Sequence, residues 1–225
     1  MIIYIFIIGT VIGSFLNLMV ERIIRKESFI FERSKCLGCN QQIPEYCLVP
    51  ILSYILLRGK CLNCKIKIPS YFPLFEFIYG INTLIFYMTE NILFFSVTTI
   101  LHLISISDIL TKRFPCQFSW LLIIIAIINT NFNYLEVLIT CIIGLLISKL
   151  GFLDNKIGNG DIDLIIVLIL IFNLLNASII IFISSLSALI YLLLNNKLRI
   201  IPFIPFIYFG TIVFLVLSYL KFSLY

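Results

Sequence analysis

The sequence predicts an all-α polytopic membrane protein, with about eight transmembrane helices and a small cytosolic loop domain between the first two. Three observations lead to this fold class. Hydrophobic residues make up 61% of the 225 residues and charged residues only 12%, which leaves too little polar surface to cover a soluble core. The mean hydropathy is +1.14. Apolar stretches recur along the chain, and the polar segment after the first of them carries four cysteines in two close pairs.

Each predicted helix corresponds to an apolar stretch that approaches the length needed to cross a bilayer, about 20 residues. These stretches are residues 2–20, 72–88, 92–110, 117–130, 134–150, 162–175, 177–194 and 203–220. The first should remain as a helix, because it has no basic start and no small-residue cleavage site. The run 164–194 would extend roughly 46 Å as one helix, so we split it at Asn173 and Asn176 into a tight hairpin.

The basic residues predict that the amino terminus lies outside and that the segment 21–71 faces the cytosol. In this topology only Lys221, of 16 lysines and arginines, falls outside, as the positive-inside rule favours. Without the hairpin, Lys197 and Arg199 would also lie outside. The expected domains are a first helix (1–20), the cytosolic loop (21–71) and a seven-helix membrane domain (72–225). The loop is basic without interleaved aromatic residues, so we expect it to meet the lipid bilayer and not nucleic acid.

Two aspartates stand in apolar surroundings, where a charge costs on the order of 2.5–3.5 kcal/mol. Asp108 lies near the end of one apolar run, and Asp161 closes the tetrapeptide Gly158-Asn159-Gly160-Asp161 at the start of another. The predicted topology places both at the cytosolic ends of their helices, at one depth. Gly158 and Gly160 would let the backbone leave the helix and a substrate strand approach. Two close carboxylates that share a proton can hydrolyse a peptide bond, one activating water and the other polarising the carbonyl.

A simpler interpretation is that each aspartate caps a helix at the membrane interface. For Asp161 this interpretation weighs about as much as the catalytic one, and for Asp154 and Asp163 it is the better of the two. His102 is more typical of a packed or hydrogen-bonded helix residue than of a ligand.

The cysteine pairs predict a metal site. Cys36 and Cys39 form one Cys-x2-Cys pair, and Cys61 and Cys64 form a second after 21 intervening residues. This is the spacing of two zinc-binding knuckles, and the reducing cytosol argues against disulfides. We therefore expect one structural zinc ion that folds the cytosolic loop. The remaining cysteines have no partner at ligand spacing and are interpreted as small apolar residues: Cys47, Cys116 and Cys141.

These motifs, in this order, resemble the type IV prepilin leader peptidase family of membrane aspartyl proteases. The segments that carry the resemblance are Gly13-Ser14-Phe15-Leu16-Asn17 followed by Arg22, SKCLGC, LSYILLRGKCLNC, YFPLFE, DILTKRFP, GNGD and IPFIPF. The resemblance implies catalysis by Asp108 and Asp161 and cleavage of the basic leader of prepilins or pseudopilins at the bacterial plasma (inner) membrane. It also implies methylation of the new amino terminus from S-adenosylmethionine. No glycine-rich nucleotide-binding fingerprint supports this second activity.

Two departures from the family pattern stand out. Asp163 occupies the position, two residues after Asp161, where the family usually has a lysine. After Asp108 the usual Ile-Pro-Asn or Ile-Pro-Asp turn is replaced by Arg113-Phe114-Pro115-Cys116. Neither removes a catalytic carboxylate.

Other functions fit the sequence less well. One alternative is a peptidase without methyltransferase activity. A presenilin-like intramembrane protease would leave the cysteine loop and the Gly-Ser-Phe-Leu-Asn motif unexplained. A transporter with aspartates on an ion pathway predicts internal repeats, which the sequence does not show. A membrane scaffold without enzymatic activity is the weakest alternative.

Overall fold

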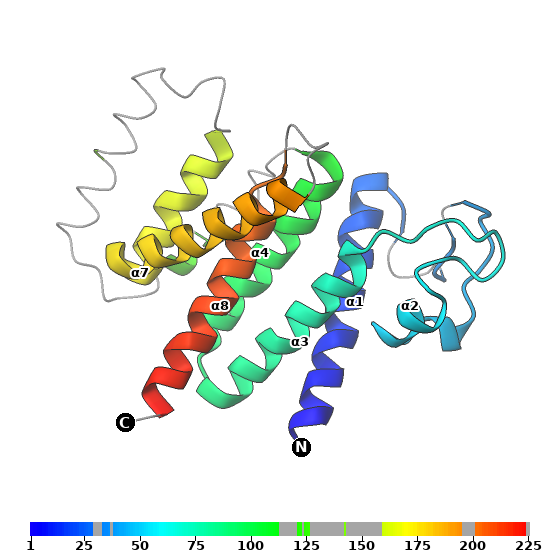
Figure 1. Ribbon diagram of the computed structural model, residues 1–225, viewed down its shortest axis with the longest axis horizontal. Helices are drawn as coiled ribbons and strands as arrows, with labels where there is room; N and C mark the ends of the chain where they lie inside the picture. The colour runs from blue at the N-terminus through cyan, green and yellow to red at the C-terminus, as the bar shows by residue number, and fades with distance from the viewer. Residues whose placement is uncertain are drawn as a thin grey trace. The chain divides into compact units, whose positions relative to one another are not determined.

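The computed structural model is built from helices joined by loops (Figure 1). It describes residues 1–28, 33–36, 38–112, 121–122, 124–126, 142, 159–194 and 201–223. The helices are α1 (Ile2–Arg25), the 3-10 helix η1 (Glu45–Cys47), α2 (Leu52–Leu56), α3 (Tyr71–Thr89), α4 (Ile92–Thr111), α7 (Asn159–Leu194) and α8 (Ile204–Ser223). Within these ranges the extended structure consists of two isolated bridges. The predicted helical fold class is confirmed.

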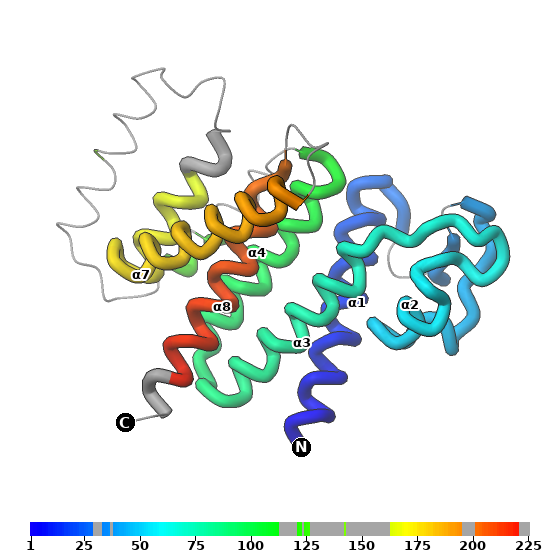
Figure 2. Tube along the Cα trace, viewed as in Figure 1, coloured from blue at the N-terminus to red at the C-terminus, as the bar shows by residue number. Residues whose placement is uncertain are grey.

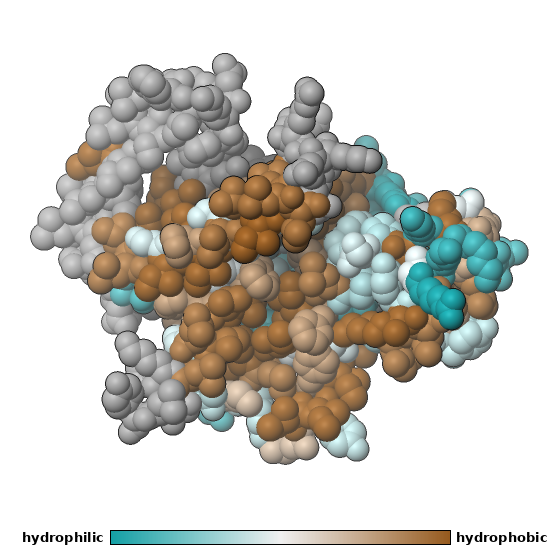
Figure 3. All heavy atoms as spheres, viewed as in Figure 1, coloured by the Kyte–Doolittle hydropathy of each residue, from teal (hydrophilic) through white to brown (hydrophobic). Residues whose placement is uncertain are grey.

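The chain divides into two compact units, Met1–Glu90 and Asn91–Tyr225. The first unit contains α1, α3 and the loop domain between them, which we call the cysteine domain (residues 26–70). The second contains α4, α7 and α8. Hydrophobic residues cover the long helices, and hydrophilic residues gather on the cysteine domain (Figure 3).

Glycines bring α1 and α3 together in the first unit. A Cβ atom on Gly9 would lie 2.9 Å from the Cβ of Thr83 and 3.0 Å from the Cα of Gly80. Small residues of this kind let two membrane helices approach closely. α1 continues to Arg25 instead of ending at residue 20 as expected. An ion pair of 2.7 Å between Arg25 and Glu21, one turn apart, supports the added turn.

Aromatic contacts join the helices of the second unit, where α8 packs against both α4 and α7. The ring of His102 in α4 meets Tyr208 in α8 edge to face, with 5.3 Å between centroids. Phe94 in α4 stacks on Phe172 in α7 at 5.2 Å. Both His102 and Tyr208 are buried, so His102 is a packed helix residue, as the sequence predicts.

The helix α7 is broken at Asn173, whose φ of 65° and ψ of 160° are not helical. The chain changes direction there, so that the two halves of α7 run at an angle to each other (Figure 2). Asparagine tolerates positive φ better than most residues. A break therefore occurs at Asn173 as predicted, but Asn176 lies within the helix, and the expected tight hairpin between two spans is not confirmed.

Three described helices are long and apolar enough to cross a membrane: Ile2–Arg25, Ile92–Thr111 and Asp163–Leu194. A shorter apolar helix covers Ile204–Leu220. The number of eight spans is not confirmed. The expected spans 117–130 and 134–150 lie almost wholly outside the described residues. α3 is not among the candidates, and it carries three buried polar residues, Glu76, Asn82 and Thr83, in its apolar run.

Candidate functional site

The two cysteine pairs lie in two loops that repeat the same backbone hydrogen bonds 25 residues apart. The Cys36 N–H donates to the carbonyl of Gln41 at 2.9 Å, and the Cys61 N–H donates to that of Ile66 at the same distance. Asn40 and Lys65, both with left-handed φ angles of 54° and 58°, donate back to the two cysteine carbonyls. An isolated bridge closes each loop, Lys35 with Gln42 and Lys60 with Lys67. The chain therefore forms two copies of one metal-binding knuckle.

The knuckles bring the four cysteine sulfur atoms close together. The Sγ atoms of Cys36, Cys39, Cys61 and Cys64 all lie within 4.8 Å of one another, and those of Cys36 and Cys64 are 3.7 Å apart. A tetrahedral zinc ion with Zn–S bonds of about 2.3 Å holds its sulfurs about 3.8 Å apart. The Gly38 N–H also points at Cys36 Sγ, at 3.4 Å. The predicted cluster of four cysteines is confirmed, and its geometry fits zinc.

The thiols of the cluster differ in acidity. The backbone N–H groups of Cys64 and Asn63 donate to Cys61 and lower the pKa of its thiol to about 6. The Ile66 N–H favours the Cys64 thiolate, but desolvation and the neighbouring thiols outweigh it and raise the pKa of Cys64 to about 11. Because a metal ion binds thiolates and not thiols, metal binding at these cysteines would release protons.

Asp108 lies one turn before the end of α4. It is buried, together with Ser105 and Ser107 of the same helix. The helix ends at Thr111, and Lys112, in a left-handed conformation with a φ of 52°, donates its N–H to the Asp108 carbonyl at 2.8 Å. The carboxylate is thus held in an apolar helix close to the point where the chain leaves it.

Asp161 belongs to the first turn of α7, which begins at Asn159. The expected departure from helix is therefore wrong for residues 159–161: Gly160 and Asp161 are helical. The first turn of a helix has free N–H groups and tolerates glycine. Gly158, Asp154 and the side chain of Asp161 lie outside the described residues. The distance between the carboxylates of Asp108 and Asp161 is therefore not described either. Asp163, two residues on, is exposed.

The amino-terminal signature places a row of polar residues on the buried side of α1. Asn17, Glu21 and Arg22 are 2%, 8% and 5% exposed. Arg22 donates through Nη1 to the carbonyl of Ser28 at 3.1 Å. The sequence marked Asn17 and Arg22 only by family resemblance, and the structure adds that both side chains lie inside the first unit.

Glu76 is a buried carboxylate to which the sequence reasoning assigned no role. It lies in α3 with 8% exposure, and its Oε2 accepts the N–H of Ile51 at 2.8 Å. This bond joins the cysteine domain to α3. A single carboxylate inside an apolar run was the signal that could have identified it.

Two family models match the chain, one after the other. The model of the bacterial Peptidase A24 N-terminal domain matches residues 7–90, and that of the type IV leader peptidase family matches residues 92–193. The first match coincides closely with the first compact unit. Neither a curated protein nor a solved structure matches the chain significantly.

Proposed function

Because the chain belongs to the type IV leader peptidase family, we propose that it cleaves the short basic leader from type IV prepilins or pseudopilins. The observation that carries the proposal is the match of both family models, in order, along one chain. Apolar helices long enough to cross a bilayer support a membrane location, which suits a substrate that is itself anchored by an apolar helix.

Asp108 and Asp161 are the proposed catalytic residues. Each lies at one end of a long apolar helix, α4 or α7, and both belong to the unit Asn91–Tyr225. Two carboxylates close enough to share a proton stay singly ionised. The ionised one would take a proton from water, and the protonated one would polarise the scissile carbonyl and later protonate the leaving amine.

The test is cleavage of a purified prepilin, with the new amino terminus of the product determined by sequencing. Asp108→Asn and Asp161→Asn should each remove nearly all cleavage, because one lost carboxylate removes either the base or the acid. Asp154→Asn is the matched control and should stay close to wild type. A folded Asp108→Asn or Asp161→Asn variant that still cleaves would disprove the dyad.

We propose that the protein lies in the bacterial plasma (inner) membrane with its amino terminus outside and the cysteine domain in the cytosol. The support is the distribution of basic residues, nine of which fall between residues 21 and 71. The cytosolic end of α4 would then be the end that carries Asp108, on the side where an unprocessed prepilin presents its leader.

We also propose that Cys36, Cys39, Cys61 and Cys64 hold one zinc ion, and that the protein methylates the amino terminus it creates. Zinc would act structurally, because four cysteine ligands leave no open position for catalysis. Methylation is supported only by the cysteine domain, which accompanies the methylating members that this chain resembles. S-adenosylmethionine would supply the methyl group. No residue is proposed as its ligand.

A further inference from the structure

The cysteine domain contains an uncharged stretch, residues 46–57, between Glu45 and Arg58. Its large apolar side chains are exposed: Tyr46 at 70%, Leu48 at 42%, Val49 at 45%, Leu52 at 54%, Ile55 at 64% and Leu56 at 73%. Six such side chains in eleven residues form a patch that soluble surfaces rarely carry without a partner. An apolar segment of this length is too short to span a bilayer and is typical of a re-entrant or interfacial element.

This segment reaches the apolar part of α1 and not merely its charged end. The Ile51 N–H bonds to Glu76, and the Cα of Glu76 lies 3.5 Å from the position of a Cβ on Gly13. Gly13 precedes Glu21, the first charged residue of α1, by eight residues, which is about 12 Å along a helix. Residue 51 therefore lies beside a stretch of α1 that is expected to be inside the bilayer.

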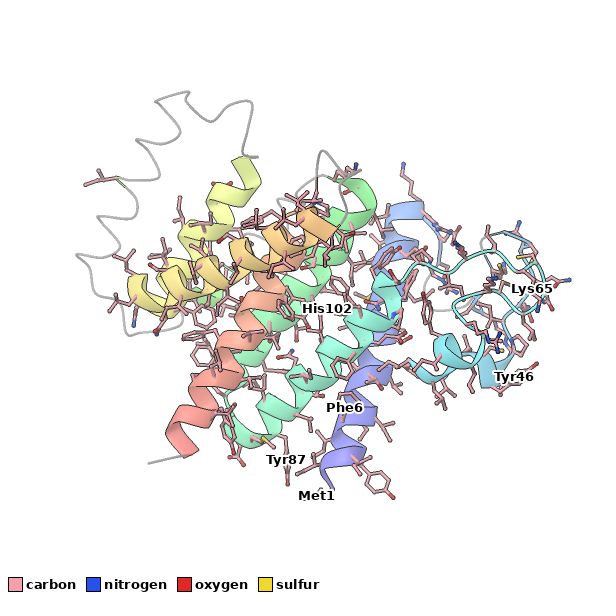
Figure 4. All side chains as sticks on the ribbon, in the orientation of Figure 1. Met1, Phe6, Tyr46, Lys65, Tyr87 and His102 are labelled. Atoms are coloured by element: carbon pink, nitrogen blue, oxygen red, sulfur yellow. The ribbon has the colours of Figure 1, made fainter. Side chains whose placement is uncertain are left out.

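A cleft of about 950 Å³ separates the segment from α1. It extends along α1 from Phe6 to Glu21, and Leu48, Leu52 and Ile55 are among the residues on its other side. The α1 residues Ile7, Val11 and Phe15, which also line it, are 50%, 50% and 52% exposed. In Figure 4, Tyr46 and Lys65 both lie on the side of the cysteine domain that faces away from α1. The exposed faces of α1 and of the segment thus form one continuous apolar surface.

The backbone of the segment is compatible with a lipid environment. Non-helical backbone persists at membrane depth only where its polar groups are satisfied within the protein. The N–H groups of Ser53, Ile55 and Leu57 donate within the turn of α2, at 2.9–3.1 Å. Ile51, which precedes α2 with a φ of 60°, has its N–H satisfied by Glu76.

We propose that residues 46–57 are a re-entrant segment, inserted into one leaflet of the bilayer beside α1, with their exposed side chains and the cleft in contact with lipid acyl chains. Continuity with α1, itself long and apolar enough to span a membrane, favours lipid over a protein partner. Charges bound the segment at both ends: Glu45, paired with Arg33 at 2.7 Å, and Arg58.

The test uses depth-dependent quenching of tryptophan fluorescence in the full chain. Trp120, the only tryptophan, is replaced by Phe. A new tryptophan is then placed at one exposed position, Leu52→Trp or Ile55→Trp, and the protein is reconstituted into phosphatidylethanolamine–phosphatidylglycerol vesicles with or without brominated acyl chains. Lys60→Trp is the matched control, because Lys60 is exposed in the same domain but lies beyond Arg58. Circular dichroism checks that each variant keeps the helicity of the parent.

Tryptophan at 52 and at 55 should lose most of its emission in brominated vesicles, whereas tryptophan at 60 should keep most of it and be quenched by aqueous acrylamide. If tryptophan at 52 and at 55 keeps its emission in the brominated vesicles, as tryptophan at 60 should, the proposal is overturned. The proposal would also be overturned if acrylamide quenched the emission of tryptophan at 52 and 55 and a synthetic prepilin peptide prevented this quenching. The patch would in that case bind protein.

Discussion

The sulfur atoms of Cys36 and Cys64 lie 3.7 Å apart, although 28 positions separate the two residues in the sequence. The contact joins the first cysteine of one knuckle to the last cysteine of the other. Among the described residues, the helices of the cysteine domain are the short η1 and α2, of three and five residues. The stability of this domain should therefore depend on what binds the sulfurs.

Purified protein should contain about one zinc ion per chain, as expected for four thiolate ligands in a tetrahedral site. Cys64→Ser should lose the metal, because it removes one ligand. Cys47→Ser should keep it, since Cys47 lies in the same domain but outside the cluster. Elemental analysis of both variants measures this directly. Metal bound equally by both would contradict the four-cysteine site.

Removal of the metal with a chelator should open the cysteine domain while leaving the long helices folded. Structural zinc contributes its binding free energy to folding, whereas α1 and α3 are held by their own close packing. Limited proteolysis should then cut between residues 26 and 70, and circular dichroism should change little. A metal-free domain that resists the protease as well as the metal-bound one would contradict the prediction.

Glu76→Ala should loosen the junction between the cysteine domain and α3. It leaves the Ile51 N–H without its acceptor, and an unsatisfied buried donor costs about 1–3 kcal/mol. Glu76→Gln keeps an acceptor oxygen and should have the smaller effect. Hydrogen exchange at the amides of residues 51–57 is the measurement, with Glu27→Ala at an exposed position as control. Equal exchange in the Ala and Gln variants would mean that the bond is not what protects this segment.

Gly13→Ala should destabilise the pairing of α1 with α3. The added Cβ would lie 2.8 Å from the Cβ of Tyr79, an atom fixed close to its own helix backbone. Overpacking of this kind costs about 1–3 kcal/mol, which outweighs the roughly 1 kcal/mol that alanine gains over glycine in a helix. The melting temperature in detergent should fall, while Ile8→Ala, on the exposed side of α1, should change it little. An unchanged melting temperature would show that α1 and α3 can move apart freely.

Cleavage and methylation should separate by mutation. Asp108→Asn and Asp161→Asn should abolish cleavage yet still methylate a pre-cleaved pilin supplied with S-adenosylmethionine, because a polar methyl donor needs a water-facing site. Methylation should depend instead on the amino-terminal signature and the cysteine domain. Joint loss of both activities in a folded aspartate variant would mean one shared site. Wild-type protein that cleaves but never methylates would be a peptidase only.

Sequence patterns predicted the helices and the cysteine cluster because both follow local rules. Apolar length located α1, α3, α4 and α8 to within a few residues at most ends, and the Cys-x2-Cys spacing identified the four sulfurs. Asn173 was found because a polar residue interrupted a run too long for one span. The end of α1 was missed because the ion pair of Glu21 with Arg25 extends the helix past its apolar stretch.

The contacts that depend on folding in three dimensions could not be predicted in this way. Nothing in the local sequence indicates that Ile51 meets Glu76, 25 residues later, or that the loop between the knuckles folds back along α1. Pairing of Asp108 with Asp161 is likewise a long-range property. It was inferred from topology and resemblance, and it stays a prediction for the mutants to decide.

The segment between Cys39 and Cys61 has 21 residues, and its two ends meet where the knuckles come together. This segment therefore forms a closed ring. The entropy lost on closing such a ring grows only slowly with its length, by about 0.6 kcal/mol for each doubling. The ring should therefore tolerate insertions and deletions at its exposed positions far better than the loss of one cysteine. Its length and apolar content can therefore change without opening the site, provided that the four cysteines remain.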